Sequence, residues 1–393
     1  MTHRYVVIGA GRQGTAAAYD LGCYGGASEV VIADCDAAVA ERASYRVNRL
    51  LSRSIATAVA VDATDPEALR GLVKAADSCI SAVPYFLNLD ITRAAIDSGT
   101  HYCDLGGNTA LVRSQLELDP AAREAGVSVI PDCGQVPGMG TSLMVYTMEQ
   151  LDDPEEVRMW DGGLPQEPQE PWNYALTFNI AGLTNEYDGR ATFLRGGELT
   201  EVDCFDPAGY EVVEFPPPFG RLEAFVTAGG TSTAPWTFSG KLRTFENRTL
   251  RYPGHAAQWK AFRDAGLFAQ HPIEVDGVRV IPRQVLHSLL ADRLEADPDT
   301  RDAVLIRVEA RGHHHGSDAA ARLDLVDRYD EETGFTAMQR TTGCDAAIGA
   351  AMMAQEITPC GAIPRELSID ASLYVAELRR RSFELAEEIY AAG

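Results

Sequence analysis

The sequence lacks the features that would place a chain in a membrane or outside the cell. No segment approaches the ~20 uninterrupted apolar residues that a spanning helix needs. The beginning, "MTHRYVVIG", enters a strand-like run at once and has neither the long apolar core nor the small-residue cleavage site of a signal peptide. We therefore expect a cytoplasmic chain with no membrane partner.

Paired cysteines and an excess of positive charge are also missing. The eight cysteines are scattered and form no CxxC pair, which favours free thiols in a reducing compartment over disulfides. Only 34 Lys and Arg residues oppose 57 Asp and Glu residues, for a net charge of −23. Such an acidic chain repels phosphate backbones and anionic lipid. This argues against nucleic acid as a partner.

What the sequence does have is an ordinary globular composition and a regular alternation in its first third. The 393 residues are 46% hydrophobic and 23% charged, which suits two or three domains. Six short β-branched runs alternate with helical stretches, as expected for right-handed parallel crossovers in a doubly wound α/β sheet over residues 1–132. The runs are 4–9, 29–34, 57–63, 79–83, 100–105 and 127–132, and the helical stretches are 12–22, 36–51, 65–75, 87–98 and 109–125.

The first strand and helix meet in the stretch "VVIGAGRQGTAAAYDLG", residues 6–22. A GxGxxG pattern after a first strand and before a first helix is typical of a Rossmann dinucleotide-binding turn. Gly9 would allow the tight turn, Gly11 the approach of a pyrophosphate, and Gly14 the close packing of helix on strand. Arg12 and Gln13 lie inside the same turn, where free N–H groups and the helix dipole favour phosphate.

An acidic residue follows the turn at the spacing expected for a carboxylate that binds the cofactor's ribose. Asp34 lies twenty residues after Gly14, at the end of the second strand. A carboxylate there accepts hydrogen bonds from the ribose hydroxyls and repels a 2′-phosphate, so the sequence predicts NAD in preference to NADP. A glycine-rich turn with a solvent-facing aspartate is the alternative. Asp62 ends the third strand near the expected adenine, and the residues after the fourth strand are expected to contact the cofactor: Ala82, Val83 and Pro84.

The pattern changes at "DCGQVPGMG", residues 132–140, where glycine and proline indicate a hinge into a second domain, 133–343. Strand-like runs now follow one another with few helices, which predicts a mixed, largely antiparallel α+β domain. The expected strands are 156–163, 173–180, 191–203, 222–228, 236–245, 302–312 and 321–329, and the expected helices are 255–265 and 282–293. In the last segment, 344–393, helices over 344–355 and 371–391 are expected to pack back on the first domain.

Three stretches carry a resemblance to a known family: "GGLPQEPQEPWNYALTFNIAGLTNEY", "LEAFVTAGGTSTAPWTFSGKLRTFENRTLRYPGH" and "LVDRYDEETGFTAMQRTTG". They resemble the L-lysine 6-dehydrogenases of the saccharopine dehydrogenase-like superfamily, over nearly the whole chain. The resemblance implies NAD-dependent oxidative deamination of the ε-amine of L-lysine to 2-aminoadipate 6-semialdehyde, which closes to a cyclic imine. It also implies a Rossmann domain, an interrupted substrate domain and a homo-oligomer. The stretch "GHHHGSD" departs from the resemblance.

This chemistry needs a group that receives a proton from the substrate amine, whose free pKa is about 10.4. Activity should therefore rise toward alkaline pH. Asp104 and Asp132 end the fifth and sixth strands, so either could hold the amine or act as the base. His255, in "RYPGH", is the best histidine candidate for acid–base work. The alternative for both aspartates is that they cap helices and loops, and for His255 that it merely begins a helix.

The α-carboxylate of an amino acid is best held by a guanidinium, which can pair with it through two hydrogen bonds. Arg243 and Arg251 lie inside the second stretch of the resemblance and are our candidates, with a surface arginine on a strand as the alternative. A substrate pocket also needs polar lining. The candidates for that lining are Tyr174, Thr231 and Ser232.

Three consecutive histidines, 313–315, are the only stretch that suggests a metal ligand set. Neighbours alternate sides in extended chain, and no carboxylate or cysteine lies nearby at a metal-like spacing, so an exposed turn without metal is expected. Cys103 and Cys133 lie at strand ends near the expected nicotinamide. Packing is expected for both, because a catalytic thiolate requires a depressed pKa.

Two other functions compete with lysine oxidation. A reductase of the same superfamily would act on saccharopine or carboxynorspermidine, and a non-catalytic NAD-binding sensor would bind NADH without changing the redox state of any amine. Oxidation of lysine alone, with release of ammonia, distinguishes the first function from both.

Overall fold

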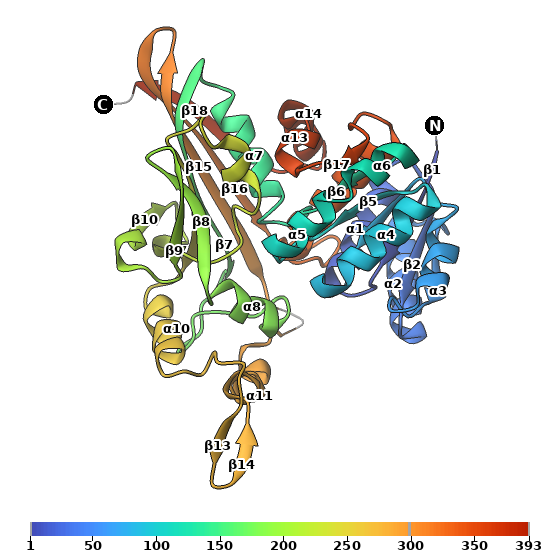
Figure 1. Ribbon diagram of the computed structural model, residues 1–393, viewed down its shortest axis with the longest axis horizontal. Coiled ribbons are helices and arrows are strands. Elements are labelled where there is room, and N and C mark those ends of the chain that lie inside the picture. Colours follow the sequence, from blue (N-terminus) through green and yellow to red (C-terminus); the bar gives the residue numbers. More distant parts are fainter. Residues whose placement is uncertain (1, 298–299, 392–393) are drawn as a thin grey trace.

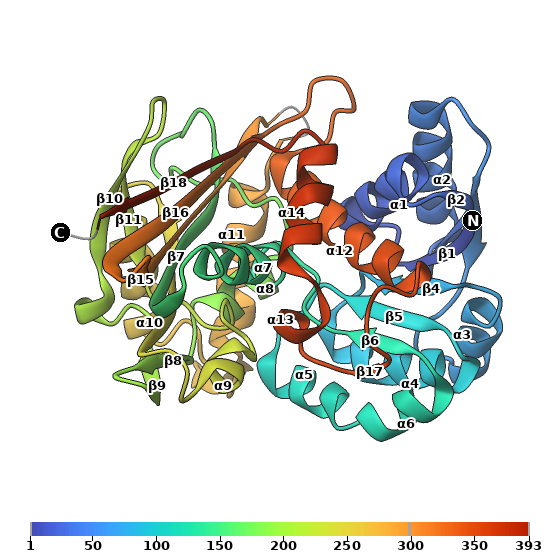
Figure 2. The same ribbon diagram turned by 90° about the horizontal axis from the view of Figure 1, so that it is seen from above.

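The computed structural model describes residues 2–297 and 300–391, which form two β-sheets side by side, each with its own helices (Figure 1). The N-terminal residues build the first sheet, and the chain then passes into the second. It finally returns to both, so residues far apart in sequence meet at the junction (Figure 2). The expected combination of a doubly wound parallel sheet and a mixed second sheet is confirmed.

The first sheet is parallel throughout, with strand order β17-β6-β5-β4-β1-β2-β3. Its strands are β1 (His3–Ile8), β2 (Ala27–Asp34), β3 (Ala56–Ala60), β4 (Ser78–Ser81), β5 (His101–Asp104), β6 (Ser128–Ile130) and β17 (Gly361–Ala362). All six predicted strands are present. The seventh, β17, was not predicted, because two residues far down the chain carry no strand pattern and become a strand only by pairing with β6.

Helices follow the strands of this sheet as predicted, with one exception. The expected helix over 109–125 is two helices, since the first helix ends at Leu116 and a second begins at Asp119, next to Pro120. Asp65 caps its helix by accepting hydrogen bonds from two backbone N–H groups, and Gly99 and Gly126 end theirs with φ of 69° and 70°. The elements are α1 (Arg12–Tyr24), α2 (Ala37–Leu51), α3 (Pro66–Val73), η1 (Tyr85–Leu87), α4 (Asn88–Ser98), α5 (Thr109–Leu116) and α6 (Asp119–Ala125).

The second sheet has strand order β10-β11-β12-β7-β15-β16-β18, and β8 with β9 branches from β12. Among its described strands, β12 and β7 are the one parallel pair. Its strands are β7 (Asp153–Pro165), β8 (Arg190–Arg195), β9 (Glu198–Asp203), β10 (Glu211–Phe215), β11 (Gly220–Phe225), β12 (Thr244–Arg251), β15 (Asp302–His314), β16 (Ser317–Arg328) and β18 (Leu385–Ala391). A separate pair, β13 (Ile273–Val275) with β14 (Val278–Val280), projects from it (Figure 1).

Two predicted strands of the second domain are wrong. Residues 173–180 form no strand, and Leu176 makes only an isolated bridge with Glu295. Within 236–245 a short helix precedes a turn, because Pro235 occupies a first-turn helical position. The helices here are α7 (Met139–Met148), α8 (Ile180–Glu186), η2 (Pro207–Gly209), α9 (Ala234–Phe238), α10 (His255–Asp264) and α11 (Pro282–Leu294).

The last segment divides between the two sheets. Helix α12 (Ala337–Ala354) is buried along most of its length and packs on α1, β4 and β5. The expected helix over 371–391 is correct only to residue 380, as α14 (Ala371–Arg380). Ser382, with φ of 61°, turns the chain, and β18 then pairs with β16 at the sheet edge. This tertiary pairing overrides the helical pattern of the sequence. The remaining helix is α13 (Arg365–Ser368).

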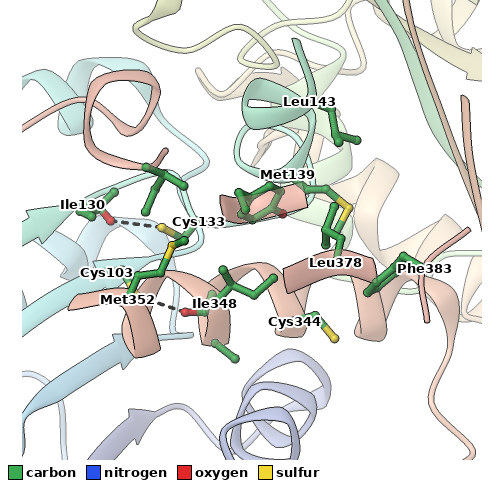
Figure 3. Packing of buried hydrophobic residues seen from close by; sticks show 14 of the residues in the cluster. Cys103, Ile130, Cys133, Met139, Leu143, Cys344, Ile348, Met352, Leu378 and Phe383 are labelled. Carbon is green, nitrogen blue, oxygen red and sulfur yellow. Dashed lines mark hydrogen bonds between the residues drawn. The ribbon is translucent and has the colours of Figure 1, made fainter. Parts of the chain in front are cut away.

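One hydrophobic cluster connects the two domains (Figure 3). It contains residues of the first sheet such as Cys103 and Ile130, residues of α12 such as Ile348, and Met139 and Leu143 of α7. Because this cluster is continuous and close-packed, the two domains are held together through α12. Among the residues that the structure describes, no helix combines the length and the apolar character that crossing a bilayer demands.

Candidate functional site

The glycine turn after β1 is closed on one side and open on the other. Gly9 has φ of +104°, and a Cβ there would lie 2.5 Å from the carbonyl oxygen of Ala82. A Cβ on Gly14 would lie 1.9 Å from the carbonyl oxygen of Gly9, so helix and turn meet without room for a side chain. At Gly11, which caps α1, a Cβ would have no neighbouring atom within 4 Å. A helix N-terminus with this open face fits a pyrophosphate.

Asp34 lies beside this turn, at the end of β2. Its Oδ2 accepts a hydrogen bond of 2.9 Å from Ala10 N, and its Oδ1 accepts one of 3.0 Å from Asp36 N. The side chain is only partly buried, and its remaining lone pairs are free for ribose hydroxyls. Asp62 is exposed after β3, where hydrogen bonds from the backbone and hydroxyl of Thr64 lower the pKa of its carboxyl.

The other residues expected at the cofactor also lie at this edge of the sheet. Arg12 is half exposed, and its guanidinium lies 3.7 Å from the carboxylate of Glu295, in the second domain. Gln13 is partly buried, and no described residue forms a hydrogen bond with its Oε1. The segment after β4 runs past the turn, held there by a 2.7 Å hydrogen bond from Ala82 N to the carbonyl of Ile8. That segment contains Ala82, Val83 and Pro84.

Asp104, at the end of β5, is fully buried and fully hydrogen-bonded. Its Oδ2 accepts from Gln115 at 2.7 Å and Tyr102 at 3.0 Å, and its Oδ1 accepts from Gly106 N at 2.7 Å and Asp132 N at 3.4 Å. Burial raises the pKa of this carboxyl, and the hydrogen bonds act against that rise. These contacts favour the alternative that Asp104 caps the loop after β5 and does not act as the base.

Asp132, after β6, has a different environment. It adopts φ of 61°, and its Oδ2 accepts a 2.5 Å hydrogen bond from the hydroxyl of Ser232 in the second domain. Its Oδ1 is buried and has no hydrogen-bond partner among residues 2–297 and 300–391. Burial raises the pKa of the carboxyl to about 8, and the charges of Asp104 and Glu366 add to that rise. A buried carboxylate with a free oxygen and a pKa near 8 is suited to receive a proton.

Arg251 is the centre of a buried polar cluster in the second domain. Its Nε donates to the hydroxyl of Tyr187 at 2.9 Å, Nη1 to the carbonyl of Leu250 at 2.9 Å, and Nη2 to Glu186 at 3.5 Å. The guanidinium carbon lies 5.2 Å from the centre of the Tyr174 ring. Burial raises the pKa of Tyr174, so its hydroxyl stays protonated. The structure thus brings together two predicted substrate residues, Arg251 and Tyr174.

His255 joins the same cluster through Tyr187, whose hydroxyl lies 2.9 Å from Nε2. Its ring lies between aromatic side chains and stacks on Trp259. Burial first, and then the charge of Arg251, hold the pKa of His255 well below its usual range. His255 is therefore a neutral partner of Tyr187 at physiological pH, which argues against a role as a general acid.

Two carboxylates of this cluster were missed. Asp161 is buried and accepts a 3.3 Å hydrogen bond from Asn247, and burial raises its pKa to about 7, with a further contribution from Glu186. Burial likewise raises the pKa of Glu186. A signal for Asp161 exists in the sequence, because alternation along β7 puts it on the same buried face as Val157 and Met159. Glu186 carries no such signal, since it ends a short helix.

The loop 229–233 connects this cluster with Asp132. A Cβ on Gly230 would lie 2.1 Å from the side-chain Nδ2 of Asn247. Because this Nδ2 donates to Asp161, the loop packs directly against the cluster. Thr231 donates a 3.0 Å hydrogen bond to the carbonyl of Thr192, and Ser232 reaches Asp132. One loop therefore contacts Asp132 of the first domain through Ser232 and the Arg251 cluster through Asn247, which donates to Asp161.

Arg243 does not belong to the Arg251 cluster. Its side chain is 60% exposed and pairs with Glu155 and Glu156 at 3.2 and 2.7 Å. The interpretation of Arg243 as a ligand for the substrate carboxylate is replaced by that of a surface ion pair, the alternative stated for it. Sequence could not separate the two arginines, because both lie on or beside β12.

Cys103 and Cys133 lie in the apolar cluster at the domain junction (Figure 3). A hydrogen bond with Cys133 and burial raise the pKa of Cys103 well above the ordinary thiol value. The sulfur of Cys133 accepts a hydrogen bond from Arg365 at 3.0 Å. Both residues thus have packing contacts, as expected.

The three histidines lie at the tip of the β15–β16 hairpin, so the expected turn is present. The sequence has no ligand set beside them at a metal-like spacing, but the fold brings a distant carboxylate to them. Asp152, more than 160 residues earlier in the chain, lies within 3.7 to 3.9 Å of His314 and His315. His313 instead faces Asp318, at 3.2 Å. Sequence spacing could not reveal Asp152, because only the pairing of β15 with β7 brings it to this tip.

Comparison with known protein families now places the chain in a class. The description "Saccharopine dehydrogenase C-terminal domain" fits residues 134–382, and "Saccharopine dehydrogenase NADP binding domain" fits residues 5–130. The chain belongs to the saccharopine dehydrogenase family. It contains that family's nucleotide-binding domain, whose open glycine turn is described above.

Individual relatives narrow the comparison. The chain is 26% identical over 225 residues to an L-glutamate-forming, NADP(+) saccharopine dehydrogenase of Pyricularia oryzae, covering 54% of this chain and 48% of that protein. It is 22% identical over 272 residues to the Saccharomyces cerevisiae protein of that name, covering 68% of this chain and 60% of that one. The match to the mitochondrial alpha-aminoadipic semialdehyde synthase of Rattus norvegicus is 26% identical, covering 51% and 22%. The matches thus span less than two thirds of these relatives.

A solved structure shares the fold over its whole length. The apo saccharopine dehydrogenase (L-Glu forming) from Saccharomyces cerevisiae superposes with a TM-score of 0.76 at 18% identity, covering 99% of this chain and 100% of that one. At this level of identity the match supports the architecture of both domains and says nothing about the substrate.

Proposed function

We propose that the protein is an NAD-dependent oxidoreductase that deaminates the ε-amine of L-lysine. The product would be 2-aminoadipate 6-semialdehyde, which cyclises to 1-piperideine-6-carboxylate, with release of ammonia and NADH. The observation that carries this proposal is the charge balance of the buried cluster. One guanidinium, Arg251, faces two carboxylates, Glu186 and Asp161.

That balance matches lysine better than a substrate with more carboxylates. Arg251 retains donors that are not used within the protein and can receive one α-carboxylate. The excess of carboxylates favours a ligand that brings positive charge, because buried charges must be paired. Saccharopine carries additional carboxylates on its glutarate arm, and these would need further buried cations. Lysine brings one carboxylate and two amines.

Asp132 supplies the proton acceptor in this proposal. A nicotinamide cofactor, when bound at the glycine turn, would accept hydride from the ε-carbon. Before that, the amine must lose a proton, and the Oδ1 of Asp132 has no hydrogen-bond partner among the described residues, so it is open to receive one. The hydrogen bond from Ser232 holds the carboxyl in place. Tyr174 and His255 are neutral and buried beside the cluster, and their rings exclude water from it.

The choice of NAD rests on Asp34 and departs from the names of the relatives, which specify NADP(+). The carboxylate of Asp34 at the end of β2 is held in place by a hydrogen bond from the glycine turn. Its negative charge would repel the 2′-phosphate of NADP. An L-lysine substrate and a homo-oligomeric assembly are parts of the same proposal.

A second function is favoured by one observation, the names of the relatives. An L-glutamate-forming saccharopine dehydrogenase would oxidise saccharopine with NADP. The deciding experiment measures NADH or NADPH absorbance with purified protein and a panel of lysine, ornithine, saccharopine and diamines. We expect lysine with NAD to give NADH and ammonia. Oxidation of saccharopine with NADP, without oxidation of lysine, would support the second function. No change in absorbance with any amine would support a non-catalytic sensor.

A further inference from the structure

The tip of the β15–β16 hairpin gathers three metal-binding side chains that play no part in the proposed function. His314 and His315 lie at the tip, and Asp152 lies between α7 and β7. One ligand atom from each of these residues lies within 4.8 Å of the others. In Figure 1 this tip lies at the end of the second sheet that points away from the nucleotide-binding domain.

Backbone contacts hold the three residues together without any ion. Asp152 N donates to the carbonyl of His313 at 3.0 Å, and His315 N donates to Asp152 Oδ2 at 2.7 Å. His315 adopts φ of 52°, in the left-handed region. In an extended chain neighbouring side chains point to opposite faces, and this conformation interrupts that pattern. The rings of His314 and His315 therefore lie side by side with centroids 4.0 Å apart.

The side-chain atoms are separated by distances that suit a shared ligand better than a direct hydrogen bond. The Nδ1 atoms of His314 and His315 lie 3.7 and 3.9 Å from the Asp152 oxygens. These separations exceed the range of an N–H···O hydrogen bond. The Nδ1 of His314 is shielded from solvent and has no hydrogen-bond partner in the part of the chain that the structure describes.

We propose that His314, His315 and Asp152 bind a divalent transition-metal ion, with zinc as the reference ion. Two imidazole nitrogens and one carboxylate oxygen form an accepted ligand set for zinc, and water can complete the tetrahedral shell. Imidazole also suits nickel and copper, so the class of ion follows from the ligands. The bound ion would join the hairpin tip to the start of β7.

His313 is the natural control, because its ring lies beside other carboxylates, those of Asp318, Glu155 and Asp153. Its Nε2 lies 3.2 Å from Asp318 and it shares no cluster with Asp152. His271 is a second control, an exposed histidine elsewhere in the second domain. Replacing either histidine removes one imidazole from the protein and leaves the proposed ligand set intact.

The experiment is calorimetric titration of the full chain with zinc chloride after removal of metal by EDTA. We expect a site of unit stoichiometry that weakens by tenfold or more in H314A/H315A, consistent with the effect of losing partners of a metal site. D152N should weaken the same site while keeping an oxygen for the hydrogen bond from His315. H313A and H271A should bind as the wild type does.

Two controls separate loss of the proposed zinc site from other effects of the substitutions. The exposed thiols of Cys23, Cys35 and Cys360 can hold zinc weakly, but they are identical in every variant, so only differences between variants count. Thermal unfolding of each variant without metal checks that the fold is intact. Equal zinc affinity in wild type and H314A/H315A, or the same loss in H313A as in H314A/H315A, would overturn the proposal. Neither readout depends on lysine oxidation.

Discussion

The nucleotide-binding edge of the first sheet and the polar cluster of the second domain are built in opposite ways. The glycine turn at this edge, Gly9 to Gly14, consists of residues close together in the chain, and its key feature is open space around Gly11, which caps α1. The cluster around Arg251 draws on β7, α8, β12 and α10, with Arg251 and Asp161 buried and Glu186 partly buried. Local geometry therefore prepares one site, and long-range charge pairing prepares the other.

This difference has a consequence for substitution. A change at the edge acts through space or a single hydrogen bond, and its effect can be confined to cofactor binding. A change in the cluster leaves another buried charge without its partner, which costs both activity and stability.

Asp132→Asn should cause the largest loss of activity, because it removes the proposed proton acceptor. We expect kcat with lysine to fall by roughly 10²–10⁴-fold, the usual contribution of a positioned acid–base group. The matched control is Asp104→Asn. Asp104 uses its oxygens within the protein, so this variant should lose stability while its folded molecules keep kcat near the wild-type value. Similar kcat values for both variants would contradict the assignment.

The same substitution should change how stability depends on pH. Burial raises the pKa of Asp132 from 3.8 to about 8, so its contribution to stability is fully present below about pH 3.8 and is lost as pH rises through 8. Asparagine binds no proton. The unfolding free energy of wild type minus that of the variant should fall between pH 4 and 8, by about 1.4 kcal/mol per pH unit at most. Urea unfolding at several pH values measures it, and parallel curves would argue against a raised pKa.

Arg251→Met should weaken lysine use strongly by removing the only guanidinium that pairs with Glu186 in the described structure. Truncating one partner of a buried charge pair costs about 2–5 kcal/mol, so kcat/KM should fall by at least tenfold and the protein should also lose stability. Arg243→Met is the control, since that exposed side chain should change stability by less than about 0.5 kcal/mol. Steady-state kinetics and thermal unfolding compare the two, and equal effects would exclude Arg251 as the substrate ligand.

Two glycines of the turn should separate folding from cofactor binding. Gly14→Ala would bring a Cβ to 1.9 Å from the carbonyl oxygen of Gly9, and we expect a loss of about 1–3 kcal/mol of stability. Gly11→Ala has space in the protein itself, so its melting temperature should stay unchanged while NADH affinity falls by roughly tenfold, or about 1.4 kcal/mol. NADH fluorescence titration measures the affinity. An unchanged affinity in Gly11→Ala would place the cofactor elsewhere.

Asp34→Ser should have the smallest effect and should act on cofactor choice alone. Losing a charged hydrogen-bond acceptor for the ribose should lower the preference for NAD over NADP by about tenfold. The ratio of kcat/KM values for the two cofactors is the measurement. If that ratio matches the wild type, Asp34 does not contact the ribose.

The parts of the fold that sequence predicted well are those with local signals. Strands β1 to β6, the glycine turn and the cap at Asp65 each depend on neighbouring residues. The errors arose where a segment takes its conformation from a distant partner. Strand β17 forms only beside β6, and β18 forms only beside β16 although its residues continue a helical pattern.

The candidate site shows the same division. The sequence named Asp132, Tyr174, Ser232, Arg251 and His255 as candidates, but it treated Asp104 as equal to Asp132 and Arg243 as equal to Arg251. Their burial and hydrogen bonds separate the members of each pair. Burial also changes the chemistry, because desolvation raises the pKa of an acid and lowers that of a histidine.

By itself, the order of residues determined a Rossmann turn, a parallel sheet and a β-rich second domain, because backbone sterics and hydrophobic periodicity act over a few residues. Tertiary structure alone decided which carboxylate keeps a free oxygen, which arginine is buried and which aspartate meets the histidines at the hairpin tip. The physical reason is that desolvation and charge pairing depend on distance in space, and residues such as Asp152 and His315 become neighbours only when the sheet forms.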